Sequence, residues 1–220
     1  MGGNRKIREQ IKQGEGIHLD FKHSISDSKK IARSLSAFAN TEGGALLIGV
    51  RDNGSIAGVK SDEEYYMIET ASLVFCKPNV EFTHKIWNIE GKNILEINVT
   101  SGTNKPYLAP DYRDIYRAFI RVNDENFVAS KIIVDVWKRK QKGFKGIKLI
   151  YDDVVEILFN EITENGSITK SQLTRITGIK SQKANTLLTN LMLMEIIDAE
   201  ISESITKFIF HKNYLKDLEQ

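Results

Sequence analysis

The feature that most constrains this chain is a short basic segment that divides it into two unequal parts. Residues 138–148 (KRKQKGFKGIK) contain six basic residues, two glycines and no acidic residue. This composition is typical of a linker, because glycine loosens the backbone and like charges repel one another. The segment is also a candidate phosphate-contacting arm. We therefore predict an N-terminal domain over 1–137, a basic linker over 138–148 and a C-terminal domain over 149–220.

The N-terminal part combines strand and helix patterns. In IHLDFK (residues 17–22) apolar and polar side chains alternate, as they do in a half-buried strand. Asp27 is a candidate N-cap for a helix whose apolar stripe is Ile31, Leu35 and Phe38. Because strands and helices follow no regular βα alternation, we expect an α+β fold rather than a doubly wound sheet. The other expected elements are helices over 4–13, 62–74 and 130–140, strands over 45–50, 56–59 and 115–122, and a hairpin of 81–87 with 94–100.

The C-terminal part contains three helical patterns, at 151–164, 169–177 and 181–194, followed by a hairpin that turns around Ser202-Glu203-Ser204. The arrangement resembles a winged helix-turn-helix domain, with Lys207 and Lys212 on the wing. In the third helix the apolar residues at helical spacing predict the buried face: Ala184, Leu187, Leu188, Leu191 and Met194. The residues expected to face outward are Gln182, Lys183, Asn185, Thr186, Thr189 and Asn190.

The charge distribution favours a nucleic-acid contact in this part of the chain. The whole chain has 31 basic and 29 acidic residues, a net charge of +2. Residues 165–194 contain no acidic residue but include Lys170, Arg175, Lys180 and Lys183, so this segment does not repel phosphates. Polar and basic side chains of this kind donate to phosphates and to base edges in the major groove. The alternative is a small helical domain used for dimerisation or for binding protein.

Three arginines recur at a spacing of four in the second half of the N-terminal part. If Arg113, Arg117 and Arg121 all lay on one strand, they would point to the same face and form a basic stripe along a phosphate backbone. The alternative is that each arginine pairs with a neighbouring acidic residue. The complete set of candidate nucleic-acid-binding residues is Arg113, Arg117, Arg121, Lys138, Arg139, Lys140, Lys170, Arg175, Lys180, Gln182, Lys183, Asn185, Thr186 and Lys207.

A group of acidic residues beside a lysine forms a second candidate site. Asp20 and Lys22 share one face of the strand expected at 17–22, Glu15 precedes it, and Asp52 follows the next apolar strand. Metal-dependent phosphodiester cleavage needs such a set, because carboxylates hold a divalent ion that activates water and a lysine stabilises charge on the phosphate. The candidate catalytic residues are thus Glu15, Asp20, Lys22 and Asp52, the three acids being metal ligands. The alternative is a solvated surface pair of an acid and a lysine.

Several motifs occur in an order that resembles one family. They are GEGIHLDFK, IARSLSAFANTEGGALLIGVRDNGSIAGV, NKPY and AFIRVNDENFVAS. Covering about residues 5–137, they resemble the Schlafen/AlbA-type family of DNA-binding domains. In that family a Glu precedes an acid-x-Lys strand, a helix ends in an AFANT-like stretch before Gly-Gly, and a later strand ends in a YxR or FxR-Val-like motif. The resemblance implies a mixed-sheet α+β domain with a DNA-binding role, often found in prokaryotic proteins beside a winged-helix module.

The resemblance also bears on the acidic residues. Some Schlafen relatives cleave RNA with three acidic residues, and by position Glu15 matches the first, Asp20 the second and Asp52 the third. This chain departs from the family in two places: Asp20 stands where relatives usually have Glu, and Arg51 stands where many have the first Asp of an Asp-Asp pair. An arginine beside a metal opposes cation binding by like-charge repulsion. A metal-dependent endoribonuclease using Mg²⁺ or Mn²⁺ is therefore an alternative and not our main expectation.

Other classes of protein are excluded or disfavoured by the residues present. The single Cys76 rules out an internal disulfide and a Cys-rich zinc finger, and it fits a reducing cytoplasm. A phosphate-binding G-x-x-x-x-G-K-[ST] loop is absent, since GSITKS at 166–171 lacks the second glycine, and no HExxH or Cys/His cluster occurs. No apolar run approaches the ~18 residues of a membrane helix, and MGGNRKIREQ lacks a signal-peptide core. We expect a cytoplasmic protein without a membrane partner.

Together these features predict a cytoplasmic, prokaryotic protein that binds double-stranded DNA as a transcriptional regulator. No cofactor is required for that role, and Mg²⁺ or Mn²⁺ enters only with the nuclease alternative. A protein-interaction adaptor, in which the winged helix mediates assembly, is the third possibility. The sequence leaves the oligomeric state open, a homo-oligomer included.

Overall fold

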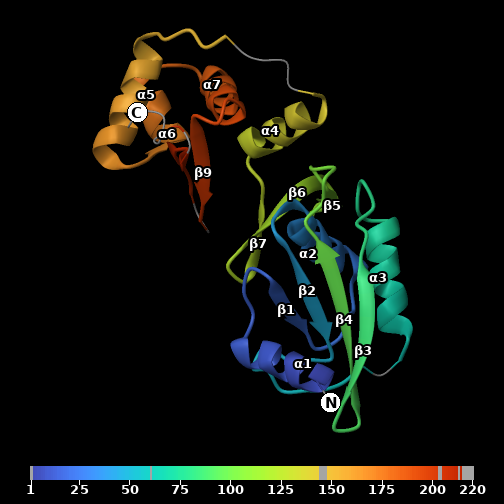
Figure 1. Cartoon of the computed structure of the whole chain (residues 1–220). Coiled ribbons are helices and arrows are strands. Elements are labelled where there is room, and N and C mark those ends of the chain that lie inside the picture. Colours follow the sequence, from blue (N-terminus) through green and yellow to red (C-terminus); the bar gives the residue numbers. More distant parts are fainter. Residues whose placement is uncertain (1, 60, 144–147, 203–204, 213, 215–220) are drawn as a thin grey trace. The chain divides into compact units, whose positions relative to one another are not determined.

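The computed structural model describes residues 2–59, 61–143, 148–202, 205–212 and 214 (Figure 1). It divides into two compact units, Met1–Ala129 and Ser130–Gln220. The division falls before the helix at 130–140, which we expected to close the first domain. Of the basic segment 138–148, residues 144–147 lie outside the described part of the chain.

The N-terminal unit contains a four-stranded mixed sheet with the order β1-β2-β4-β3 (Figure 1). β1 and β2 run parallel, whereas β4 is antiparallel to both of its neighbours, β2 and β3. The expected hairpin is confirmed, since β3 and β4 are adjacent in the chain and paired. The strands are Leu19–Lys22 (β1), Gly43–Ile48 (β2), Thr83–Ile89 (β3) and Lys92–Thr100 (β4).

A second, antiparallel sheet of the same unit has the order β5-β6-β7. It consists of Leu108–Pro110 (β5), Tyr116–Val122 (β6) and Glu125–Val128 (β7). β6 confirms the strand expected at 115–122, whereas the short strands β5 and β7 carry too few residues to show a periodic pattern. The return strand expected at 56–59 is wrong, because only an isolated bridge from Val50 to Ile56 forms there.

Helix α2, Ser28–Asn40, holds the two sheets of the N-terminal unit together. It packs on β5 and β6 of the small sheet and on β2 and β4 of the large one. Asp27 begins the helix as expected, because its carboxylate accepts the backbone N–H groups of Lys29 and Lys30. Ile31, Leu35 and Phe38 are buried. A Cβ at Gly44 would lie 2.4 Å from the Phe38 ring, so the backbone of β2 approaches α2 where only glycine fits.

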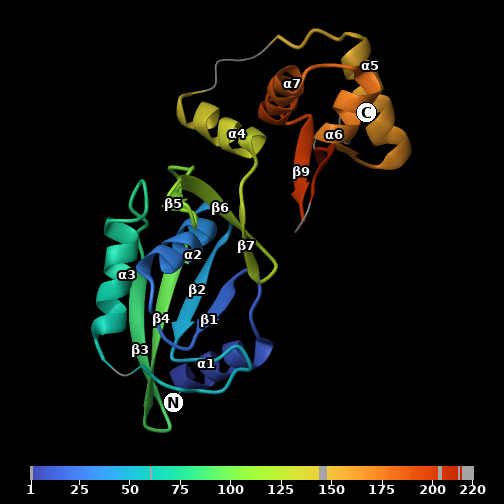
Figure 2. The ribbon, with the colours of Figure 1, turned by 180° about the vertical axis from the view of Figure 1, so that it is seen from behind.

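The other helices of this unit are α1, Gly2–Gln13, and α3, Glu63–Leu73. α3 packs against α2 and lies beside β3 in both views (Figure 1, Figure 2). One apolar cluster of this unit contains Leu46 and Ile97 of the large sheet with residues of α2, and a second contains Phe21 and Leu47 with Ile7 of α1. The large sheet is therefore covered by apolar side chains on both of its faces.

Among its described residues the C-terminal unit contains four helices and a three-stranded antiparallel sheet with the order β8-β10-β9. The helices α4 to α7 and the strand β9 are labelled in Figure 2. All three helices and the hairpin expected beyond residue 150 are present. Their shared core includes Leu173, Leu188 and Phe208. The elements are Lys131–Gln141 (α4), Asp153–Asn165 (α5), Ile168–Thr169 (β8), Lys170–Thr177 (α6), Ser181–Leu193 (α7), Ile197–Ile201 (β9) and Thr206–Phe210 (β10).

Helix α4 belongs to this second core. Ile132 is buried within it, and α4 packs against α7. Ser130 begins the helix by accepting the backbone N–H of Ile133 through its hydroxyl. In the described part of the chain, no helix is both long and apolar enough to cross a membrane.

Candidate nucleic-acid interface

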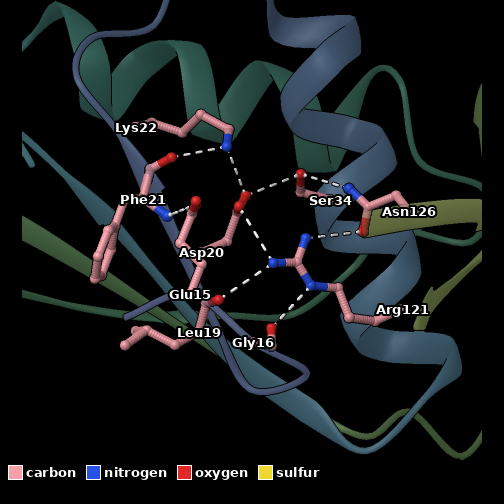
Figure 3. Close-up of polar contacts among 9 residues, drawn as sticks. All are labelled: Glu15, Gly16, Leu19, Asp20, Phe21, Lys22, Ser34, Arg121 and Asn126. Atoms are coloured by element: carbon pink, nitrogen blue, oxygen red, sulfur yellow. Dashed lines mark hydrogen bonds and ion pairs between the residues drawn. The ribbon is translucent and has the colours of Figure 1, made fainter. Parts of the chain in front are cut away.

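Asp20 of β1 and Arg121 of β6 form a buried ion pair in the N-terminal unit (Figure 3). Each residue is only 3% exposed, and Arg121 Nη2 lies 3.3 Å from Asp20 Oδ1. The guanidinium also donates to the carbonyls of Gly16 and Leu19, at 3.1 and 3.2 Å, and to Asn126 Oδ1 at 3.2 Å. Each of the three guanidinium nitrogens therefore donates to an acceptor inside the protein.

The Asp20 carboxylate is likewise held from several sides (Figure 3). Its Oδ2 lies 2.9 Å from Lys22 Nζ and accepts a hydrogen bond from Ser34 Oγ at 3.5 Å. Asn126 donates to the same Ser34 hydroxyl at 3.1 Å and so closes the network. The two nearby cations neutralise the charge that a metal ion would otherwise attract.

Glu15 lies at the edge of this network. Its Oε1 accepts the backbone N–H of Phe21 at 2.7 Å (Figure 3). Partial burial raises the pKa of the Glu15 carboxyl, and the neighbouring Asp20 carboxylate raises it further. The Phe21 N–H and the Lys22 ammonium act in the opposite direction but do not reverse the shift. Glu15 and Asp20 are thus neighbours, as the sequence predicted.

Asp52 does not join them. It is exposed in a tight turn that is closed by a hydrogen bond from Arg51 N–H to the Ser55 carbonyl at 3.0 Å. Across the described ranges, no group of three or more His, Cys, Asp or Glu residues is placed to hold a metal ion. The predicted metal set of Glu15, Asp20 and Asp52 is therefore not assembled. The residues present do not fit a Mg²⁺ or Mn²⁺ centre, and the first two acids have a visible structural use.

The expected arginine stripe does not form either. Arg121 is buried, Arg113 lies before β6 in the turn after Pro110, and only Arg117 is an exposed residue within the strand. Arg117 Nε lies 3.8 Å from an Asp111 carboxylate oxygen. Burial of Arg121 follows from its position: Ala118, Phe119 and Ile120 are buried beside it, and β6 packs on α2 at this point.

Sequence reasoning missed the two polar partners of this ion pair, Ser34 and Asn126. One signal was present, because Ser34 follows Ile31 by three residues and precedes Phe38 by four. That spacing places a hydroxyl inside the apolar stripe of the helix, where a buried polar group requires a partner. The second partner, Asn126, lies in a strand too short to be predicted.

In the C-terminal unit, α6 and α7 are joined by a short turn at Gly178. Thr169 and Gln172 form a reciprocal capping box at the start of α6, and Gly178 ends the helix at a φ of +71°. The first turns of α7 leave Gln182, Lys183 and Thr186 exposed, as the sequence predicted. The basic residues around them, Arg175, Lys180 and Lys207, are exposed and Lys170 is half-buried.

The second half of α7 differs from the prediction. Thr189 is buried, and Asn190 is half-buried and accepts a hydrogen bond from Arg139 Nη1 of α4 at 2.8 Å. Asn185 is also half-buried and lines a pocket of about 330 Å³ between the starts of α4 and α6 and the strand β10. These residues were expected to face outward, but α4 packs on α7 and covers part of that face.

The contact made by Arg139 places the basic end of α4 beside α7. Lys138, Arg139 and Lys140 are all exposed and occupy the last turn of α4, not an extended linker. The Asp152 carboxylate lies 3.8 Å from the Lys183 ammonium. The C-terminal unit therefore presents exposed basic side chains from α4, α6, α7 and β10.

A comparison with protein families matches residues 15–130 to the family described as Schlafen, AlbA_2. One similar solved structure is the DIP2311 protein from Corynebacterium diphtheriae, at 20% identity and a TM-score of 0.45, covering 72% of this chain. Another is the N-terminal domain of a RecG-related protein from Nitrosomonas europaea, at 15% identity and a TM-score of 0.41. That match covers 70% of this chain and 97% of the domain, whereas this chain spans 32% of the DIP2311 protein.

Proposed function

This chain belongs to the Schlafen, AlbA_2 family, and on that premise we propose that it is a nucleic-acid-binding protein that acts on double-stranded DNA as a transcriptional regulator. The C-terminal unit supplies the duplex contact in this proposal. Its helices α5, α6 and α7 and the hairpin β9–β10 serve as a winged helix-turn-helix domain, with α7 as the recognition helix.

The observation that carries the proposal is the exposed start of α7. Gln182, Lys183 and Thr186 are exposed there, and the segment 165–194 contains no acidic residue. Lys183 lies 3.8 Å from Asp152, and the Thr186 hydroxyl donates to the Gln182 carbonyl at 3.1 Å. The Gln182 amide can donate to base edges and the Thr186 hydroxyl can accept there, whereas a lysine contacts guanine or phosphate. The first turn of a recognition helix is the part that reaches the bases in helix-turn-helix proteins.

The basic end of α4 extends this surface. Arg139 donates to Asn190 of α7, which keeps the cations of this turn close to the recognition helix. Lysine and arginine beside such a helix contact phosphates without reading sequence. We therefore assign Lys138, Arg139 and Lys140 to the DNA backbone and the first turns of α7 to the major groove.

The test is fluorescence anisotropy with a labelled DNA duplex at several salt concentrations. Wild-type protein is expected to bind, with affinity falling steeply as salt rises, because each phosphate contact releases a counterion. Lys183→Gln removes one cation and is expected to flatten the plot of log affinity against log salt by about 0.9 if Lys183 contacts a phosphate. Lys12→Gln, on exposed α1 of the other unit, is the matched control and should behave as wild type.

Two outcomes would overturn this proposal. One is the absence of salt-dependent duplex binding at low ionic strength. The other is an equal effect of Lys183→Gln and Lys12→Gln. If the protein instead retains a stable protein partner and no affinity for nucleic acid, the adaptor role replaces the regulator.

A further inference from the structure

The tip of the hairpin between β5 and β6 carries exposed aromatic and basic side chains, of which only Arg113 and Arg117 are assigned above. Tyr112 is 82% exposed, the highest exposure among the large apolar side chains of the described residues, and Ile115 is 46% exposed. Burying a tyrosine ring is favourable, so an open ring is a candidate contact surface.

Several hydrogen bonds hold the backbone of the tip. Asp111 Oδ1 accepts the backbone N–H groups of Arg113 and Ile115 at 2.8 and 3.0 Å, and Asp111 N–H donates to the Ile115 carbonyl at 2.9 Å. At its base, Arg33 of α2 donates to the Pro110 carbonyl at 3.3 Å. Desolvation of the Asp111 carboxyl opposes ionisation, but the two N–H groups and the nearby arginines outweigh it and lower its pKa. The backbone on either side of Tyr112 is thus held by hydrogen bonds.

Two tyrosines of this hairpin already carry a cation on one ring face. The Arg113 guanidinium lies 5.1 Å from the Tyr112 ring centre, and the Lys77 ammonium lies 4.1 Å from the Tyr116 ring centre. Such contacts orient both partners. Because Tyr112 remains so exposed, most of its ring surface is available to another flat group.

The charges around the tip favour an anionic partner. Lys29 pairs with Asp114 at 2.6 Å and Arg117 lies 3.8 Å from Asp111, which accounts for both acids. Neither Arg113 nor Lys77 forms an ion pair with a carboxylate in the described part of the chain. The patch therefore combines an open aromatic ring with two cations that form no close ion pair among the described residues.

We propose that this hairpin tip binds single-stranded nucleic acid, with an unpaired base stacked on Tyr112 and adjacent phosphates bound by Arg113, Arg117 and Lys77. Aromatic rings and cations in alternation are the usual platform for unpaired strands, because every base has a flat face and every nucleotide a negative charge. A duplex cannot use the ring in this way, since its bases already stack on one another. The inference rests on the nucleic-acid-binding function proposed above. It adds single-strand binding by the N-terminal unit to duplex binding by the C-terminal unit.

The experiment measures stacking directly. Labelled 12-nucleotide oligo(dT) and oligo(U), each with a central 2-aminopurine, are titrated with full-length protein alongside a DNA duplex. Stacking of 2-aminopurine on a tyrosine quenches its fluorescence, so wild type should bind both single strands with quenching. Comparing the two oligomers shows whether DNA or RNA is preferred. Tyr112→Ala should weaken single-strand binding by roughly fivefold to a hundredfold and abolish the quenching, with duplex affinity unchanged.

Matched variants keep the result interpretable. Tyr112→Phe retains the ring and should bind within about twofold of wild type. Tyr66→Ala removes another exposed tyrosine, 63% exposed on α3, and should have no effect. The inference is overturned if Tyr112→Ala binds single strands as wild type does, or if single strands do not bind while the duplex still does. Loss of duplex binding with single-strand binding intact would instead overturn the proposed duplex function alone.

Discussion

The Arg121 guanidinium and the Asp20 carboxylate are charges that the N-terminal unit has removed almost completely from water. Such a pair is held by geometry and by additional hydrogen bonds, since desolvation costs each ion several kcal/mol. Gly16, Leu19, Ser34 and Asn126 supply those hydrogen bonds here. The protein is therefore stable with both buried ions present, whereas removing one of them leaves the other charge buried without its partner and destabilises the fold.

We expect Arg121→Met to destabilise the N-terminal unit by about 3–5 kcal/mol, because it leaves the buried Asp20 carboxylate without its closest guanidinium. Urea unfolding followed through Trp87, in a Trp137→Phe background, measures this unit alone. Arg117→Met is the matched control on the same strand, and its exposed side chain predicts a change within about 0.5 kcal/mol. Equal effects of the two substitutions would contradict the structural role of Arg121.

The raised pKa of Glu15 predicts how the stability of the protein depends on pH. Its pKa in the folded protein lies above the ordinary value of 4.5, so between those two values the folded state holds a proton that the unfolded state has lost. The contribution of Glu15 to stability therefore falls as the pH rises through this window. Glu15→Gln removes the titration, and its free energy of unfolding relative to wild type should increase from pH 4 to pH 7.

Glu90 provides a control of opposite sign. A hydrogen bond and the charge of Arg8 lower the Glu90 pKa, so its contribution to stability is present above the ordinary value and is lost as the pH falls. Glu90→Gln should accordingly become less stable relative to wild type as the pH rises. Urea unfolding at both pH values tests the pair, and a trend of the same sign in both variants would refute the assignment for Glu15.

At the scale of elements, α2 connects the two sheets through polar contacts as well as apolar ones. Near its end the Asn40 amide donates to the Tyr107 and Phe119 carbonyls, at 2.7 and 2.9 Å, and accepts the Tyr107 N–H at 2.8 Å. Ser36, one turn earlier, donates to the Tyr107 carbonyl and accepts the Phe119 N–H. One helix face thereby satisfies the backbone beside β5 and within β6.

We expect Asn40→Ala to lower the free energy of unfolding by about 2–4 kcal/mol, because it leaves the buried N–H of Tyr107 and the buried carbonyl of Phe119 without a partner. The same Trp87 signal reports the change. Asn88→Ala removes an exposed amide that donates to Asn93 Oδ1, and it should change stability by about 0.5 kcal/mol or less. A cost for Asn40→Ala as small as that of Asn88→Ala would show that β5 and β6 do not depend on this helix face.

At the scale of the whole molecule, the net charge of +2 conceals an uneven distribution. Residues 1–137 carry equal numbers of basic and acidic residues, whereas 138–148 carry a charge of +6 and 149–220 a charge of −4. The described part of the basic segment is mostly the last turn of α4. The positive charge is thus attached to the C-terminal unit by folded structure.

The division at Ser130 predicts how fragments behave. A fragment of residues 130–220 retains the whole second core and should unfold in a single cooperative transition, measured by circular dichroism on heating. A fragment of residues 148–220 lacks α4 and leaves the partners of Ile132 exposed. We expect it to be less stable by about 2 kcal/mol or more, from the lost burial of Ile132 in this core. Equal stability of the two fragments would mean that α4 belongs to the N-terminal unit.

Much of the fold was predictable, because a helix of several turns or a strand of several residues shows a periodic pattern of apolar and polar side chains. The stripe of α2, the hairpin of β3 and β4 and the three helices beyond residue 150 were read in this way. The two-residue β8 and the three-residue β5 were not, because strands this short are defined by their partners rather than by a pattern. Of the candidate sites, the exposed start of α7 was predictable, since the buried face of that helix fixes the opposite one.

The types of the longer elements, the family and the segments of net positive charge follow from the amino-acid sequence alone, because they depend on residues close together in the chain. Which charges are available to a ligand depends on how the elements pack. Asp20 and Arg121 lie 101 residues apart and meet because the folded chain brings Arg121 of β6 against Asp20 of β1. This ion pair buries Arg121, which was expected to contact phosphate, and it neutralises Asp20, which was expected to bind a metal ion. Whether a charged side chain remains exposed to water depends on which elements pack together, and the local sequence pattern does not predict that packing.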